Sequence, residues 1–320
     1  MKTKIVAVVG PTASGKTGLS IALAKALDGE IVCCDSMQIY DGMDIGTAKP
    51  TLSEQDGVPH HLFGFADPAK EFNCADYAAL AKNKVYEIAA RGKLPIFCGG
   101  TGLYLDAVMR AGEFSPCPAS EACREELKRQ LELEGAESLH RELALCDPES
   151  AAATHPNNTV RVMRALEIYR LSGIPKSEWD RRSREYEPEF DLIAVGLKYN
   201  DRGLLESRID LRVDLMLTEG LEDEVRSLLA AGKLSRGGGQ KAIGYKEMMD
   251  YIEGFETLEH AADKIKLATR QYSKRQMTWF RSHGDVHWVE ADAIGEDGRG
   301  QMRACDAILA DALTYIREKI

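Results

Sequence analysis

The chain has 320 residues, of which 44% are hydrophobic and 29% are charged, and its formal net charge is −10. This length is enough for one large α/β core with an insertion or a second small domain, and the composition is ordinary for a water-soluble globular protein. No apolar run reaches membrane-spanning length, and the apolar stretch near the start ends at Gly10-Pro11, which is too short for a signal peptide. We therefore expect a cytoplasmic protein without a membrane anchor.

The cysteines and paired histidines do not form a recognisable metal-binding pattern. None of the eight cysteines belongs to a C-x-x-C pair, and Cys33, Cys34 and Cys98 lie in apolar, strand-like runs. Cysteine in such a run usually behaves as a small buried hydrophobe. His60 and His61 are adjacent and therefore point in different directions. We expect reduced core cysteines and structural histidines.

The segment GPTASGKT at residues 10–17 is an uninterrupted phosphate-loop motif, G-x-x-x-x-G-K-[ST]. An apolar β-like run at residues 4–9 precedes it, and a helical pattern at residues 19–27 follows. The loop amides can surround an anion at the helix N-terminus, Lys16 adds a positive charge, and the Thr17 hydroxyl can hold Mg²⁺. This segment predicts a site for a phosphate or diphosphate, with magnesium as cofactor.

Two further strands are predicted, at residues 30–34 and 93–98, with a helix at residues 74–90 between them. Asp35 follows the first strand, and the glycine-rich segment 99–102 follows the second. Ligands bind at the carboxyl ends of parallel strands, so we expect both segments to converge with the phosphate loop. Asp35 suits a magnesium ligand or a proton acceptor, although a turn aspartate is the alternative. Thr101, in the glycine-rich segment, is a weaker candidate for a functional residue.

Pro116 and Pro118 mark a break after this region. Helices are predicted at residues 121–134, 137–146 and 159–171, and a strand at residues 192–197 resumes the α/β pattern. The predicted fold is therefore a P-loop NTPase-like α/β protein, a parallel sheet core with an inserted all-helical domain. Its expected domains are the first part of the core at 1–116, the helical insertion at 117–188 and the core continuation at 189–320.

Charge is distributed unevenly along the chain. Residues 264–281 carry six basic residues and no acid, whereas residues 113–150 carry ten acids and four bases. Helical spacing places Lys266, Arg270, Lys274 and Arg281 on one face, and Ile265, Ala268, Tyr272 and Trp279 on another. The basic face is a candidate footprint for nucleic acid or polyphosphate, and a solvated helix face is the alternative.

Taken alone, these features predict a phosphate-loop kinase or transferase with a helical lid. Eight segments occurring in order carry a more specific resemblance: GPTASGKT (10–17), DSMQIY (35–40), GTAKP (46–50), PHHL (59–62), GGTGLY (99–104), RVMRALE (161–167), AIGYKE (242–247) and TRQYSKRQMTWFR (269–281). Together they resemble the tRNA dimethylallyltransferase family, which prenylates adenosine 37 beside the anticodon. The sequence lacks the Cys/His zinc module of eukaryotic relatives, which fits the bacterial type.

The resemblance implies a division of labour among the residues. The phosphate loop would hold the diphosphate of dimethylallyl diphosphate with Mg²⁺ on Thr17, and the catalytic residues would be Asp35 as general base, Thr101, Lys16 and Arg212. Implied diphosphate ligands are Gly10, Pro11, Thr12, Ala13, Ser14, Gly15, Lys16, Thr17, Arg208 and Arg212. Implied tRNA contacts are Asp35, Ser36, Met37, Gln38, Thr101, Arg124, Thr159, Val160, Arg161, Val162, Met163, Arg164, Arg270, Lys274 and Arg281.

Two other functions remain open on the sequence. A small-molecule kinase would need a compact, arginine-rich lid, whereas the predicted insertion begins with an acidic stretch. An adenylate isopentenyltransferase, which prenylates free AMP, is similar through the first motifs. The long insertion and the basic helix favour a large RNA partner over either alternative. We expect the protein to act as a monomer on the anticodon stem-loop of tRNA, with no membrane partner.

Overall fold

The computed structural model describes residues 2–110, 120–234, 239–282, 285–296 and 298–320. The chain divides into two compact units, a core unit of Met1–Met109 with Phe190–Ile320 and a second unit of Arg110–Glu189. The predicted boundary between residues 116 and 117 lies outside the described residues. The predicted return to the core after residue 188 lies one residue before the division at Phe190.

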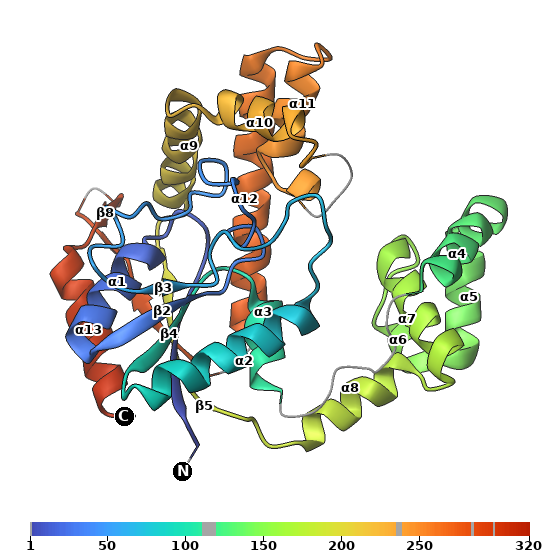
Figure 1. The fold of residues 1–320 in the computed structure, drawn as a ribbon, viewed down its shortest axis with the longest axis horizontal. Coiled ribbons are helices and arrows are strands. Elements are labelled where there is room, and N and C mark those ends of the chain that lie inside the picture. Colours follow the sequence, from blue (N-terminus) through green and yellow to red (C-terminus); the bar gives the residue numbers. More distant parts are fainter. Residues whose placement is uncertain (1, 111–119, 235–238, 283–284, 297) are drawn as a thin grey trace. The chain divides into compact units, whose positions relative to one another are not determined.

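The core unit is built on a six-stranded sheet in which every described strand pairing is parallel. Its order is β3-β2-β4-β1-β5-β6, with phosphate-loop strand β1 in the interior (Figure 1). The strands are β1 Lys4–Val9, β2 Gly29–Cys33, β3 His60–His61, β4 Leu94–Cys98, β5 Asp191–Lys198 and β6 Val286–Glu290. This confirms the predicted parallel sheet core. The sequence analysis assigned no strand to β3 or β6.

Helices cover both faces of this sheet, which is why its strands read as continuous apolar runs. Alternate residues of β1 face opposite sides: Ile5 and Ala7 pack in the cluster that contains α2, whereas Val6 and Val8 pack with α1 and α13. The helices of this unit are α1 Lys16–Leu27, α2 Cys74–Ala90, α3 Gly102–Met109, α9 Arg202–Thr218, α10 Leu221–Ala230, α11 Tyr245–Ile252, α12 Leu258–Ser282 and α13 Cys305–Arg317, with a 3₁₀ helix at Gly239–Lys241. Strands β7 Asp292–Ile294 and β8 Gly300–Met302 form a small antiparallel pair.

The described part of the second unit is helical, as predicted, and has its own apolar core. Its helices are α4 Glu121–Glu134, α5 Ala136–Cys146, α6 Pro148–Ala152, α7 Thr159–Ser172 and α8 Lys176–Glu185. Leu127, Leu143 and Leu166 from three of these helices are fully buried against one another. Gly173 ends α7 with φ 69°, a left-handed conformation that glycine adopts without steric cost.

The predictions about cysteines and histidines agree with this fold. Cys33, Cys34 and Cys98 are buried, and burial raises the pKa of each thiol, so they remain protonated core residues. The His61 ring contacts the Glu30 carboxylate at 2.6 Å, and the His60 ring contacts the Val58 carbonyl at 2.8 Å. Among the described residues there is no metal-binding cluster of His, Cys, Asp and Glu, and no helix that could cross a membrane.

Candidate functional site

The phosphate loop lies between the end of β1 and the start of α1. Gly10 has φ 135°, and a Cβ there would lie 2.8 Å from the Leu197 carbonyl oxygen, so the turn away from the sheet requires glycine. The ammonium group of Lys16 donates to the Pro11 carbonyl at 2.6 Å, across the mouth of the loop. The Ser14 hydroxyl is buried and has no hydrogen-bond partner among the described residues. The loop therefore presents a cation and an unused hydroxyl together.

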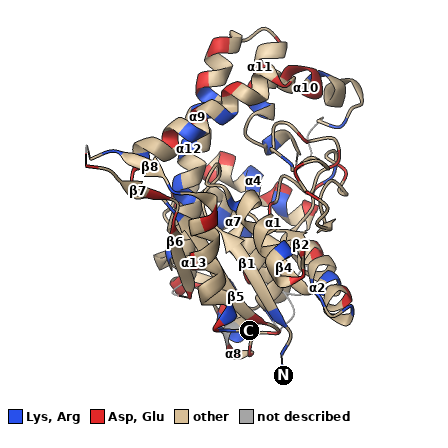
Figure 2. Ribbon diagram, turned by 90° about the vertical axis from the view of Figure 1, so that its left-hand side faces the viewer, with Lys and Arg blue, Asp and Glu red and all other residues tan. Residues whose placement is uncertain are grey.

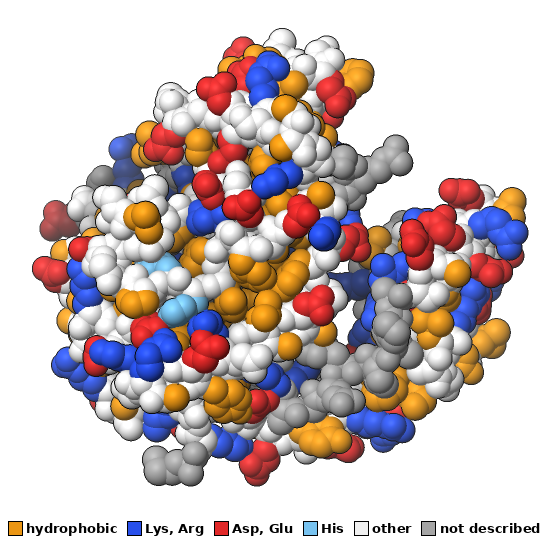
Figure 3. Space-filling view, in the orientation of Figure 1, with side chains coloured by type: hydrophobic (Ala, Val, Ile, Leu, Met, Phe, Trp, Pro, Cys, Tyr) orange, Lys and Arg blue, Asp and Glu red, His pale blue; other side chains and the backbone are white. Residues whose placement is uncertain are grey.

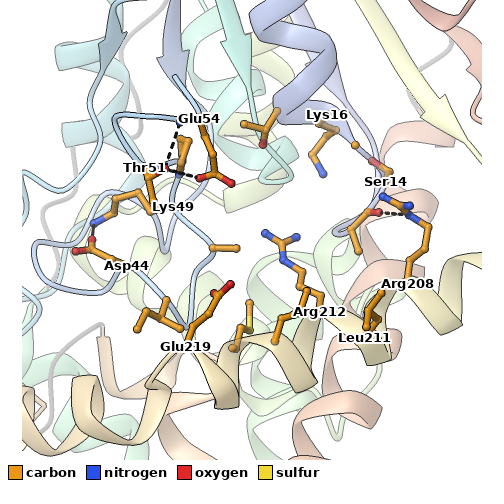
Figure 4. A pocket seen from close by; sticks show the side chains of 18 residues that line it. Ser14, Lys16, Asp44, Lys49, Thr51, Glu54, Arg208, Leu211, Arg212 and Glu219 are labelled. Carbon is orange, nitrogen blue, oxygen red and sulfur yellow. Dashed lines mark hydrogen bonds and ion pairs between the residues drawn. The ribbon is translucent and has the colours of Figure 1, made fainter. Parts of the chain in front are cut away.

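Two arginines from α9 reach the same loop from the opposite side (Figure 4). Arg208 Nε donates to the Ala13 carbonyl at 3.0 Å, and an Arg212 terminal nitrogen donates to the Thr12 hydroxyl at 3.2 Å. These two arginines and Lys16 line a pocket of about 720 Å³. In Figure 4 the Arg212 guanidinium and the Lys16 ammonium both point into it. Three cationic groups on loop and helix thus surround a space that an anion can occupy.

Burial lowers the pKa of Lys16 to about 8, and the neighbouring Arg212 contributes in the same direction. Asp35 opposes the shift, since its carboxylate favours the charged ammonium. The ammonium form of Lys16 therefore predominates only below about pH 8. A bound anion would add a further charge that favours the protonated lysine.

A second pocket of about 270 Å³ adjoins the first, because Arg212 and Met216 line both. Asp35 lies in this second pocket, and its Oδ1 accepts the Met37 N–H at 2.9 Å. The aspartate thus closes a local turn, as the structural interpretation predicted, and it also lines the pocket. Its role as magnesium ligand or proton acceptor stays a prediction. Apolar side chains form much of the remaining wall: Met37, Ile209, Val213, Met216, Ala242, Ile243 and Ile265.

Thr101 stands behind the lining of this second pocket. Its N–H donates to the Cys34 carbonyl at 3.1 Å, and its hydroxyl accepts the Ser36 N–H at 3.0 Å. The phenol of Tyr272, which does line the pocket, hydrogen-bonds to Thr101. Thr101 therefore joins the Asp35 segment to α12, and the structure does not place it among the residues that line either pocket.

Gln276 joins the two halves of the site. Its Oε1 accepts the Thr12 N–H at 2.8 Å, and its Nε2 donates to the Gly100 carbonyl at 3.1 Å. The residue is 4% exposed, so both bonds are shielded from water. A Cβ on Gly100 would lie 1.9 Å from Nε2, which explains glycine at that position. One amide thus fixes the phosphate loop relative to the segment that carries Thr101.

The phosphate loop and the Asp35 segment meet at the pockets, as predicted, whereas residues 99–102 line neither pocket. That segment is instead joined to the other two through hydrogen bonds of Gly100 and Thr101. The pockets bring together these predicted residues: Thr12, Ala13, Ser14, Gly15, Lys16, Thr17, Asp35, Ser36, Met37, Arg208 and Arg212. Gln38 instead donates to the carbonyls of Thr47 and Ala48. The sequence analysis named neither Gln276 nor Arg275 as a site residue, and it placed Tyr272 only on the helix face that excludes the basic residues. Their helical spacing with Trp279 was the available signal, because positions 272, 276 and 279 share one face.

Of the predicted RNA contacts of the second unit, Val162 is wrong as a side-chain contact, and Arg124 and Arg164 carry ion pairs within the unit. Val162 is 1% exposed and lies in the unit's core, so its side chain does not face solvent. Helical periodicity causes this: Val160 is 72% exposed, two positions earlier on α7. Arg124 and Arg164 both pair with the Glu167 carboxylate, at 2.9 and 2.7 Å. These two arginines serve the packing of the unit, although both remain partly exposed.

The predicted basic face of α12 is divided in the structure. Arg270 makes two hydrogen bonds with Asp210, and Lys266 pairs with Asp214, so both connect α12 to α9. Figure 2 shows basic and acidic segments along both helices. Lys274 and Arg281 have no ion-pair partner among the described residues. They line a groove of about 260 Å³ with Arg202. The open positive charge is therefore smaller than the sequence predicted, and Arg270 is largely neutralised.

Comparison with known proteins decides the family. An IPP transferase family model matches residues 38–283, and an isopentenyl transferase model matches residues 3–61. The chain belongs to the IPP transferase family. This confirms the resemblance found in the eight sequence segments.

Family relatives match over nearly the whole chain. A tRNA dimethylallyltransferase of Geobacillus thermodenitrificans is 48% identical over 290 residues, which is 91% of each chain, and one of Bacillus subtilis is 48% identical over 289 residues, 90% of this chain and 91% of the relative. The crystal structure of a tRNA isopentenylpyrophosphate transferase from Bacillus halodurans has a TM-score of 0.70 at 44% identity, covering 99% and 98% of the two chains. A eukaryotic dimethylallyltransferase acting on tRNA has a TM-score of 0.77 at 31% identity, covering 90% of this chain and 74% of the other.

Replacing Gln276 by methionine should weaken diphosphate binding about tenfold and lower the free energy of unfolding by about 1–3 kcal/mol. The Thr12 N–H and the Gly100 carbonyl would lose their buried partner while the side-chain volume is kept. Calorimetric titration with inorganic diphosphate and chemical denaturation measure the two effects. Gln271→Met, on the exposed side of the same helix, is the control. Unchanged diphosphate affinity in Gln276→Met would show that the bridge does not position the loop.

Diphosphate affinity should fall as pH rises through 8, because Lys16 then loses its charge in the free site. The loss approaches about tenfold for each further pH unit, as expected when binding takes up one proton. Lys16→Arg retains its charge, so comparison with this variant cancels the titration of the anion itself. Parallel pH profiles for the two proteins would show that Lys16 keeps its proton throughout.

Proposed function

We propose that this protein transfers the dimethylallyl group of dimethylallyl diphosphate to N6 of adenosine 37 in tRNA, next to the anticodon. The observation that carries the proposal is the pair of adjoining pockets that share Arg212 and Met216. The first holds Lys16, Arg208 and Arg212 at the phosphate loop, which suits a diphosphate, and the second combines Asp35 with an apolar wall. A substrate with a charged head and a short hydrocarbon tail fits this arrangement. Because its acceptor is tRNA, we place the activity in the cytoplasm.

The phosphate loop and α9 would stabilise the leaving diphosphate. As the bond between C1 and its oxygen breaks, negative charge grows on the diphosphate, and Lys16, Arg208 and Arg212 are fixed around that space. The unpartnered Ser14 hydroxyl supplies a donor for a phosphate oxygen. These groups are held before the substrate arrives, so little reorganisation is needed during the reaction.

Magnesium fits the same pocket in our proposal. Thr17 lines it beside Lys16 and would offer its hydroxyl, the remaining ligands being diphosphate oxygens and water. Mg²⁺ usually binds through few protein groups together with substrate phosphates. This suits the pocket, because its acids Asp44, Glu54 and Glu219 are not part of any metal-binding group of three or more among the described residues. When bound, the ion would help neutralise the leaving diphosphate.

Asp35 is the group we assign to proton removal. The N6 lone pair attacks C1 of the prenyl group, the bond from C1 to oxygen breaks, and N6 becomes a strong acid that gives its proton to Asp35. Tyr272 lies in the same pocket, but burial and the charge of Asp35 raise its pKa to about 12. The phenol therefore stays protonated near neutral pH and donates hydrogen bonds. The adenine would leave its stack to reach this pocket.

In the core unit, Lys274 and Arg281 are the residues that we propose bind phosphates of the RNA. Both lie on α12 and line the groove with Arg202. The net charge of −10 is an average over the chain, and Figure 3 shows acidic and basic side chains interspersed on one face of the core unit. In the second unit, Arg161 and Val160 are exposed at the start of α7, where we propose further contacts with tRNA.

Incubation with unmodified tRNA and dimethylallyl diphosphate tests the proposal, with nucleoside mass analysis as the readout. We expect a dimethylallyl group on adenosine 37 only. AMP as acceptor and ATP as substrate are measured in parallel. Prenylation of AMP in preference to tRNA would identify an adenylate isopentenyltransferase, and phosphate release from ATP at a comparable rate would favour a kinase.

Asp35→Asn should lower kcat by about 10²–10⁴ with little change in tRNA affinity, because the amide retains the shape but does not accept the proton. Single-turnover prenylation and filter binding separate the two quantities. Asp41→Asn removes a carboxylate that pairs with Lys233 on the surface and serves as control. Near-normal turnover in Asp35→Asn would limit Asp35 to its role in the turn.

Replacing Lys274 and Arg281 by glutamine should weaken tRNA binding similarly across tRNA sequences. Each lost phosphate contact lowers the slope of log affinity against log salt by about one. Arg270→Gln is the matched comparison, since its charge already pairs with Asp210. It should alter stability more than the salt slope. A larger loss of slope in Arg270→Gln than in the double variant would contradict this division of the helix.

A further inference from the structure

Two of the segments that define the resemblance supply no reacting group in the chemistry proposed above. These are GTAKP at residues 46–50 and AIGYKE at residues 242–247. In the structure both meet a third residue, Glu224 on α10, for which the sequence gave no functional signal. The contacts made by this carboxylate indicate what the two segments do.

Glu224 accepts hydrogen bonds from three successive backbone N–H groups. The amides of Asp44 and Ile45 donate to Oε2 at 2.9 and 2.7 Å, and the amide of Gly46 donates to Oε1 at 3.1 Å. The phenol of Tyr245 also donates to Oε1. Successive N–H groups turned toward one point form an anion-binding concavity. Here the anion is a side chain of the protein itself.

Packing fixes this arrangement from two sides. Tyr245 is fully buried, and a Cβ on Gly46 would lie 2.5 Å from its ring, so only glycine allows this approach. From the other side, Gln38 Nε2 donates to the carbonyls of Thr47 and Ala48, at 3.0 and 2.9 Å. Residues 44–48 are thus held through their main chain on both sides.

This held segment forms a wall of both pockets. Asp44, Ile45 and Ala48 line the larger, cationic pocket, whereas Gly46 and Thr47 line the smaller pocket that contains Asp35. Helix α9 contributes residues to both pockets as well, through Arg212 and Met216. Residues 44–48, α9 and the phosphate loop thus each border both pockets, so a group extending from the diphosphate position toward Asp35 would lie beside residues 44–48.

The charge of Glu224 is compensated by backbone N–H groups and not by a basic side chain in the described part of the chain. Among the described residues no Lys, Arg or His lies within ion-pair distance of it, so the backbone amides are the groups that compensate its charge. An amide in place of the carboxylate would turn an NH₂ donor toward N–H or O–H donors on one of the two sides. The segment would then lose contacts and face a repulsive pair of donors.

We propose that Glu224, supported by Tyr245, is a positioning residue that fixes residues 44–48 and so sets how long a prenyl chain the site accepts. This inference rests on the proposed function, because it concerns the hydrocarbon part of the same donor. Glu224 itself touches no reacting atom. It acts through the main chain of the wall, which is why substitution should change donor selectivity.

The test compares Glu224→Gln and Tyr245→Phe with the parent, using dimethylallyl and geranyl diphosphate as five- and ten-carbon donors for tRNA. The ratio of kcat/KM for the shorter over the longer donor should fall about tenfold or more in Glu224→Gln. It should fall less in Tyr245→Phe, which keeps the three backbone bonds. Glu222→Gln changes an acid of the same helix that pairs with Arg226 on the surface, and should match the parent.

Hydrogen exchange of residues 44–46 in the free protein supplies a readout that does not depend on activity. Exchange of these amides should be at least about tenfold faster in Glu224→Gln than in Glu222→Gln. Unchanged exchange, or an unchanged donor ratio in a folded Glu224→Gln protein, would overturn the inference. If that variant does not fold, an unchanged donor ratio in Tyr245→Phe would overturn it.

A parent that prenylates neither tRNA nor AMP would refute the proposed function separately. The dissociation constants of the two donors, measured by calorimetry, would then replace kcat/KM in the same comparison. If the ratio of the two dissociation constants is the same in Glu224→Gln as in the parent, the inference is overturned.

Discussion

The candidate site depends on one buried amide, Gln276, which connects two strand ends that the sheet only brings near each other. Parallel pairing places the ends of β1, β2 and β4 at one edge, but it does not set the distance between the loops that leave them. Gln276 sets that distance, with one oxygen on the phosphate loop and one nitrogen on the glycine-rich segment. Its burial makes both bonds costly to break. Helix α12 is thereby part of the site, although it is far from the phosphate loop in sequence.

Cationic groups are concentrated where the protein as a whole is acidic. The charge of −10 is a property of the entire chain, whereas Lys16, Arg208 and Arg212 act across a few ångströms in a partly buried space. The effect of charges at such a site is less screened than on the surface. The lowered pKa of Lys16 records the cost of bringing this charge there without a bound anion. A bound diphosphate would offset part of that cost, because its charge favours the protonated lysine.

Salt bridges explain why charge patterning along α12 gave only part of the answer. Spacing alone predicted that four basic residues share a solvent-facing stripe. Asp210 and Asp214 of α9, themselves one turn apart, pair with two of them. A helix sequence does not reveal whether another helix will present acids to it. The same limit applies to Arg124 and Arg164 in the second unit, where Glu167 binds both.

The sequence by itself determined the elements whose signals are local. These include the phosphate loop with its flanking strand and helix, and the bounds of α2 and α4. It also located Asp35 correctly at a strand end, because parallel α/β sheets place their ligands there. The two-residue strand β3 and the C-terminal strand β6 form by pairing with strands that are distant in the sequence. Their own residues show no local pattern strong enough to predict a strand.

Only the tertiary structure decided which side chains join the loops of the site. Gln276 and Glu224 act on backbone groups, and any residue type can supply a backbone N–H or carbonyl, so no complementary side chain marks the partner in the sequence. Val162 shows the reverse case, since a position within a matching motif proved to be core. Local sequence fixes where a strand or helix begins and which residues share a face. Which residues pack against that face is determined only by the tertiary structure.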